Sequence, residues 1–94
     1  MNTPNPIVEI VSTGRYLPDG VLTNDDLAKR IDTSDEWIRT RTGIEERRIA
    51  GADTTTADMG AASARLALEG AGIDPSDVDI LIVSTATPDR WLPS

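Results

Sequence analysis

The chain has 94 residues, a net charge of −7, and neither cysteine nor histidine. The acidic balance opposes general binding to nucleic acid, where neutralisation of phosphates dominates affinity, and the missing cysteines exclude a disulfide framework, a thiolate metal site and a cysteine nucleophile within these residues. Because the sequence begins without a basic, apolar leader and no window approaches the length of a membrane span, we expect a cytoplasmic protein with no membrane partner.

The first third of the chain predicts a strand followed by a helix. Residues 7–14 are rich in β-branched side chains and end at a glycine, which is typical of a strand. A Pro-Asp-Gly turn follows within residues 15–20. Residues 23–31 then predict a short helix capped by Thr23 or Asn24.

A second helix is expected to begin at Thr33. Thr33 and Glu36 have the spacing of a capping box, in which each side chain bonds the other residue's backbone N–H. Gly43 supplies the stop, and Arg39 and Arg41 suit the negative end of the helix dipole.

The rest of the chain predicts one long helix and one buried strand. Residues 44–50 fit either a strand or an extended loop. Residues 57–71 predict a helix that ends at Gly72. Residues 78–86 contain an unbroken Ile-Leu-Ile-Val run, which is typical of a strand buried on both faces of a parallel sheet.

The long helix is expected to be mostly buried. Its long polar side chains, Asp58, Arg65 and Glu69, fall on one narrow stripe at the helical period, and the remaining residues are small or apolar. The order of strand, helices and strand fits an α/β fold built from βαβ units. The exposed apolar surface that such a helix would leave indicates the opening part of a larger fold.

One helix face combines groups that suit a nucleotide. Thr33, Trp37 and Arg41 are spaced i, i+4, i+8, with Asp32 just before them. An indole offers a stacking plane, a guanidinium offers a phosphate fork, and the threonine hydroxyl can bond a base edge. The alternative is structural, since tryptophan commonly packs in a core and arginine commonly ends a helix.

Other polar clusters predict no site. The adjacent acids at residues 25–26 and 35–36 suit helix starts and lack the ligand spacing of a metal site. Residues 53–58 lack the glycines and lysine of a phosphate loop, so we interpret them as a helix cap at Thr55 or Thr56. Residues 45–48 predict a solvated charged edge.

The run of residues 23–50 resembles the N-terminal signature of β-ketoacyl-acyl-carrier-protein synthase III. The motifs that carry the resemblance fall in the family's order and spacing: STGRYLP at 12–18, DTSDEWI at 32–38, RTGI at 41–44 and LPS at 92–94. The resemblance runs from about Ile7 to Ser94 and implies that residues 1–94 form the N-terminal portion of the first domain of a thiolase-like, five-layered αβαβα fold, incomplete in this chain.

The resemblance also implies a function. Enzymes of this family join an acyl-coenzyme A primer to malonyl-acyl carrier protein with loss of CO₂, starting type II fatty-acid synthesis, and they work as homodimers without a cofactor. It implies that Trp37 stacks on the adenine of coenzyme A, that Arg41 meets its phosphates, and that Thr33 bonds near the base. The family's catalytic Cys, His and Asn would lie beyond Ser94, so the 94-residue chain alone is expected to be inactive.

Position 92 departs from the family pattern. The corresponding residue reaches the acyl pocket of the other subunit and is commonly Phe in enzymes that start from acetyl groups, whereas this chain has Leu92. A smaller side chain implies acceptance of longer or more branched primers, unless Trp91 fills the space.

Two other functions stay open from the sequence. One is an acyltransferase of secondary metabolism on the same fold, which the residues beyond Ser94 would distinguish. The other is a free-standing, non-catalytic module that binds a nucleotide or a protein.

Overall fold

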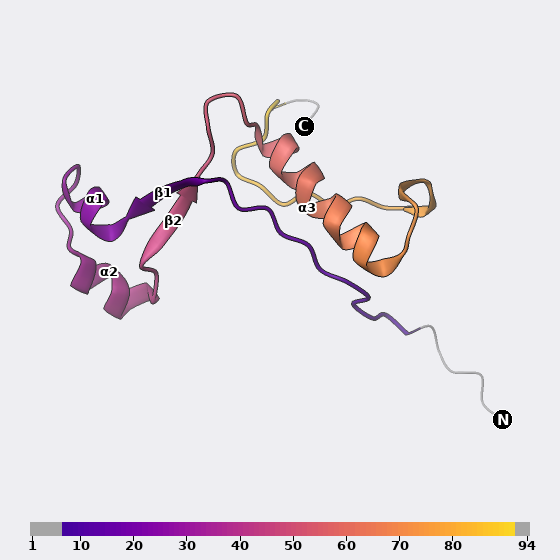
Figure 1. Cartoon of the computed structure of the whole chain (residues 1–94), viewed down its shortest axis with the longest axis horizontal. Helices are drawn as coiled ribbons and strands as arrows, with labels where there is room; N and C mark the ends of the chain where they lie inside the picture. Colours follow the sequence, from indigo (N-terminus) through magenta and orange to yellow (C-terminus); the bar gives the residue numbers. More distant parts are fainter. Residues whose placement is uncertain (1–6, 92–94) are drawn as a thin grey trace. The chain divides into compact units, whose positions relative to one another are not determined.

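The computed structural model describes residues 7–91, which form two compact units (Figure 1). The β1–β2 unit spans Leu17–Thr55, and the α3 unit comprises residues 7–16 and 56–91 of the described chain. The elements are β1 (Gly20–Thr23), α1 (Asn24–Ala28), α2 (Asp35–Thr42), β2 (Glu46–Ile49), α3 (Thr56–Ala71) and a 3-10 turn, η1 (Pro75–Asp77).

The β1–β2 unit is a two-stranded antiparallel sheet with both short helices in the connection between its strands (Figure 1). The register pairs Gly20 with Ile49 and Thr23 with Glu46. The structure thus resolves residues 44–50 in favour of a strand, whereas β1 was not predicted. Its four residues follow a turn and leave only Leu22 partly covered, so they carry little of the hydrophobic pattern that marks a strand.

Helix α1 begins as predicted and ends sooner. Thr23 is its N-cap, and the capping box is complete because Asp26 N–H donates to the Thr23 hydroxyl while Thr23 N–H donates to the Asp26 carboxylate, both at 3.1 Å. The helix ends at Ala28, three residues short of the predicted 23–31 span, and turn-type bonds such as Arg30 N to the Leu27 carbonyl follow.

The cap of helix α2 lies one residue later than predicted. Its N-cap is Ser34, whose hydroxyl accepts from Trp37 N–H at 3.1 Å, so the assignment of Thr33 as the cap was wrong. The two acids that follow Ser34 occupy the first turn, where negative charge is favoured. The predicted stop is confirmed, because Gly43 adopts a left-handed conformation with φ of 75°.

Helix α3 matches the predicted 57–71 span to within one residue, and Gly72 ends it with φ of 67°. The helix is not buried, however: every one of its residues keeps at least partial exposure, and Leu66 is half exposed. The predicted burial belongs to a larger fold, and within the described residues no layer covers the apolar sides of α3.

The two predicted strands flanking α3 are extended segments without a ladder. Residues 7–14 and 78–86 belong to no strand in the described chain, and their side chains are open, with Val8 97% and Ile82 85% exposed. A β-strand needs a partner for its backbone groups, and none of the described residues supplies one. Both strand predictions, and the burial predicted for the second, were wrong here.

Residues 12–14 nevertheless run against α3. A Cβ atom placed on Gly14 would lie 2.6 Å from the backbone nitrogen of Ala67, so only glycine permits this approach. No helix among residues 7–91 is both long and apolar enough to cross a bilayer.

Candidate functional site

A hollow of about 330 Å³ opens at the start of α2 in the β1–β2 unit. It is lined by Asp32, Thr33, Ser34 and Trp37. Two of these, Thr33 and Trp37, are predicted site residues, and Asp32 adjoins Thr33 in the sequence. The sequence does not predict Ser34, because the capping-box spacing assigns the cap to Thr33.

Trp37 and Arg41 lie together as their i, i+4 spacing predicts. The Arg41 guanidinium carbon is 5.1 Å from the centroid of the Trp37 ring, a cation–π contact. Trp37 is 54% exposed. The pair therefore presents an aromatic plane and a cation to solvent, beside the hollow.

Thr33 also borders the hollow, but from the segment that precedes α2. It precedes α2 and so does not share a helix face with Trp37 and Arg41, which corrects the i, i+4, i+8 arrangement. It is half-buried and borders the hollow. Since Ser34 caps the helix, the Thr33 hydroxyl is not needed for that role.

Asn24 connects α1, both ends of α2, and β2. Its side-chain amide donates to Asp35 Oδ1 at 2.9 Å and to the Ile44 carbonyl at 2.7 Å, and its Oδ1 accepts from Arg47 at 2.9 Å. Asn24 is 1% exposed, the most buried of the described side chains. Sequence reasoning treated it only as a possible cap, because nothing local indicates a network whose members are distant in sequence.

The charges around α2 are held in defined positions. Asp35 accepts from Asn24 and pairs with Arg39 at 3.3 Å, and the Asn24 amide, followed by Arg39, lowers the pKa of the Asp35 carboxyl below its ordinary value. Arg47 also donates to the Leu22 carbonyl, so it is not the solvated charge that residues 45–48 predicted. The Asp35 carboxyl therefore stays ionised through the physiological range of pH.

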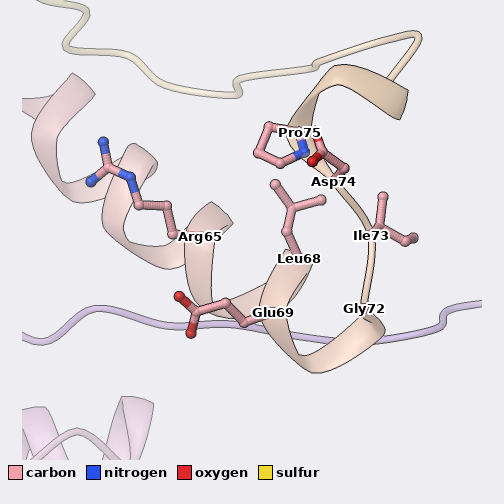
Figure 2. Close-up of a pocket in the computed structure, with 7 residues that line it drawn as sticks. All are labelled: Arg65, Leu68, Glu69, Gly72, Ile73, Asp74 and Pro75. Carbon is pink, nitrogen blue, oxygen red and sulfur yellow. The ribbon is translucent and has the colours of Figure 1, made fainter.

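The α3 unit has hollows of a different kind. One of about 440 Å³ surrounds the turn after α3, where Figure 2 shows the Leu68 side chain pointing toward Pro75. Its acid, Asp74, is used locally, because the carboxylate accepts from Ser76 N–H and the Ser76 hydroxyl at 2.9 and 2.7 Å. Two further charged side chains, Arg65 and Glu69, line the same hollow.

The larger hollow of the α3 unit, about 620 Å³, lies between small residues of α3 and residues 81–85. At its rim the Asp89 carboxylate accepts from the N–H groups of Thr56 and Ala57 at 3.0 and 3.2 Å. Asp89 therefore caps the start of α3 although it lies more than thirty residues later in the sequence. Asp89 was not singled out from the sequence. Within residues 7–91 no three acidic side chains gather as metal ligands would.

Comparisons with known proteins connect the chain to one group of enzymes, although no protein-family model matches it. A β-ketoacyl-[acyl-carrier-protein] synthase III of Geobacillus kaustophilus is 59% identical over 85 residues, which cover 90% of this chain and 27% of that protein. The crystal structure of the 3-oxoacyl-[acyl-carrier-protein] synthase III of Aquifex aeolicus matches with a TM-score of 0.77 and 52% identity, covering 89% of this chain and 27% of that one.

A third comparison agrees with these two. The synthase III of Thermus thermophilus matches with a TM-score of 0.73 and 43% identity over 92% of this chain and 27% of that one. The chain thus spans about a quarter of the length of the relatives it matches. The predicted fold class is confirmed, in that the described residues are a small α/β part of a thiolase-like fold. By sequence and by structure, residues that make up about 90% of this chain are similar to proteins named β-ketoacyl-acyl-carrier-protein synthase III.

Proposed function

We propose that the protein carrying this chain condenses an acyl-coenzyme A primer with malonyl-acyl carrier protein, releasing CO₂, and that α2 holds the nucleotide end of coenzyme A. The 59% identity to a β-ketoacyl-[acyl-carrier-protein] synthase III carries the proposal for the reaction. The exposed Trp37–Arg41 pair beside a hollow supports the assignment of the nucleotide site.

The proposed site has the chemistry that a nucleotide needs. The Trp37 ring supplies a stacking surface for adenine, and Arg41 supplies a mobile cation for phosphate. Thr33, half-buried at the edge of the hollow, supplies a hydroxyl for the polar edge of the base. In the free protein the guanidinium lies over the ring, so we propose that phosphate and base compete with this internal contact when the ligand arrives.

The covalent chemistry needs groups outside these residues. The chain has no cysteine and no histidine, so a thiolate that accepts the acyl group and a base that assists decarboxylation belong to the rest of the protein in this proposal. The chain's share is to hold the substrate's handle. Coenzyme A takes part as a portion of the substrate, and the proposal includes no separate cofactor.

The remaining parts of the proposal follow from the family resemblance alone. They are a homodimer in the cytoplasm and a contribution of Leu92 to the acyl pocket across the dimer. Leu92 lies outside the described residues. The relatives found support neither an acyltransferase of secondary metabolism nor a free-standing binding module.

A kinetic experiment on the whole protein tests the site. Trp37→Ala and Arg41→Ala should each raise the KM for acyl-coenzyme A more than they lower kcat, because a handle binds the ground and transition states alike. The expected losses are about 1–3 kcal/mol for the stacking surface and about 1.5–3 kcal/mol for the charged contact. Arg30→Ala, which removes an exposed arginine of the same unit, is the control. Parent-like KM values for both variants would show that the pair is structural.

A further inference from the structure

We infer that Asn24 is a positioning residue that fixes helix α2, and with it Trp37 and Arg41, in the geometry that binds the ligand. The inference rests on the proposed function, because it assigns to α2 the task of presenting a nucleotide site. The hydrogen bonds of Asn24 go to residues other than Trp37 and Arg41, so its effect would be transmitted through the helix.

The geometry of the amide carries the inference. One Asn24 amide nitrogen donates both to Asp35, the first residue of α2, and to the carbonyl of Ile44, which follows the helix's Gly43 cap. A single side chain therefore fastens both ends of the eight-residue helix. A helix this short has little stability of its own, so its position depends on such contacts.

The other contacts of Asn24 attach this clamp to the sheet. Its Oδ1 accepts from Arg47 of β2, and its backbone N–H donates to the Glu45 carbonyl at 3.1 Å. Ile38, the buried apolar residue of α2, is 8% exposed and supplies a single apolar anchor. Because the apolar anchor is so small, the polar clamp has a large share in setting where α2 lies.

Asparagine is the side chain that this position requires. The site needs two N–H donors for Asp35 and Ile44 and one oxygen acceptor for Arg47, which is what a carboxamide offers. Aspartate has the same size but no donor, and it would bring a second carboxylate against Asp35. Asn24→Asp therefore breaks both tethers to α2 while it keeps the acceptor for Arg47.

The test compares Asn24→Asp with a variant that weakens the same unit elsewhere. Thr23→Ala removes the hydroxyl that caps α1 and leaves every bond between Asn24 and α2 in place. Both variants of the whole protein are studied by titration with coenzyme A and by hydrogen exchange of the α2 amides, at a temperature where circular dichroism shows them folded.

We expect Asn24→Asp to weaken coenzyme A binding about tenfold or more, since two part-buried hydrogen bonds are lost, one of them to a charged group. Exchange of the α2 amides should accelerate. Thr23→Ala should bind coenzyme A as the parent does, with faster exchange confined to α1. In the double variant Asn24→Asp with Asp35→Asn, the new amide at position 35 can donate to the new carboxylate at position 24. This variant should therefore recover part of the affinity.

Two results would overturn the inference: parent-like affinity in folded Asn24→Asp, or an equal loss of affinity in Thr23→Ala. If Asn24→Asp does not fold, Asp35→Ala removes one of the two tethers, and unchanged α2 exchange in that variant overturns the inference as well. A parent that fails to bind coenzyme A refutes the proposed function instead, while the exchange of the α2 amides still decides whether Asn24 holds the helix.

Discussion

The β1–β2 unit and the α3 unit differ in how far their side chains are paired or buried. In the β1–β2 unit, short elements with few apolar residues are joined by side-chain hydrogen bonds, and the buried residues of the described chain, Pro18, Asn24 and Ile38, all lie there. In the α3 unit, one regular helix is accompanied by two extended apolar segments whose side chains are open to solvent.

The difference shows which structural features form within a short stretch of chain and which need further residues to cover them. In the β1–β2 unit, Leu17–Thr55, the helix caps, the turns and the hydrogen bonds of Asn24 all form within 39 residues. The α3 unit has the composition of a fold interior, and nothing among the described residues covers its apolar segments. The relatives that the chain matches are more than three times as long as the chain, which accords with a larger core.

The largest expected effect concerns the open segments of the α3 unit. The 94-residue chain by itself should self-associate at micromolar concentration, because large exposed apolar patches drive association. Ile82→Asp should reduce this association strongly, whereas Ala52→Asp, with the same change of charge on an exposed loop, should not. Sedimentation velocity measures the effect. A monomeric parent, or equal improvement from both variants, would contradict this view of the α3 unit.

A smaller effect is expected from breaking the clamp of the β1–β2 unit. Arg47→Met removes the donor to the buried Asn24 oxygen and should cost about 1–3 kcal/mol of unfolding free energy, the usual cost of an unsatisfied buried polar group. Arg48→Met, on the next residue, removes one bond to the Pro18 carbonyl and should cost less. Denaturant unfolding of the whole protein gives both values, and equal costs would argue against a special role for the Asn24 network.

The cap of α3 should have an effect of similar or smaller size. Asp89→Ala removes the carboxylate that accepts from the first two N–H groups of the helix, and loss of an N-cap acceptor typically costs about 0.5–2 kcal/mol. Hydrogen exchange should accelerate in the first turn of α3 and stay unchanged in α2. Equal acceleration in both helices would mean that the two units are not separately stabilised.

The smallest expected effect is a loss of folding stability at acidic pH. Hydrogen bonds from Thr23 lower the pKa of Asp26, and the Asn24 amide lowers the pKa of Asp35, each below the ordinary value of 3.8. A lowered folded-state pKa gives stability that is complete above pH 3.8 and is lost as the pH falls below it through the lowered value. Urea midpoints measured from neutral to strongly acidic pH should therefore stay level and then fall. Asp35→Asn should make that fall shallower, and an unchanged slope would contradict the assignment.

Residue types and spacing were enough to predict the features that depend on neighbours in sequence. The glycine stops at Gly43 and Gly72, the Thr23 cap and the span of α3 are local, and each is confirmed. The start of α2 was misplaced, because Thr33 and Ser34 both suit a cap and the capping-box spacing favoured the wrong one. The Trp37–Arg41 contact was also local and was found from the i, i+4 spacing.

Features that depend on distant residues were not accessible in the same way. Strand β1 exists because β2 pairs with it, more than twenty residues further along the chain. Asn24 is buried through contacts across similar sequence separations. The hydrogen bonds of Arg47 to Asn24 and of Asp89 to the start of α3 also span such separations. Residues 7–14 and 78–86 show the converse, because a strong β propensity produced no strand where none of the described residues supplies a ladder partner.

The central claim, that α2 holds the nucleotide end of an acyl thioester, is tested most directly by comparing two substrates. The whole protein and its Trp37→Ala variant would be assayed with acyl-coenzyme A and with the matching acyl-pantetheine, which has the same thioester and no nucleotide. We predict that Trp37→Ala lowers kcat/KM for acyl-coenzyme A by about tenfold, the loss of one stacked base, and leaves kcat/KM for acyl-pantetheine unchanged. An equal loss with both substrates would contradict the claim, because the tryptophan would then support the fold or the chemistry and not the nucleotide.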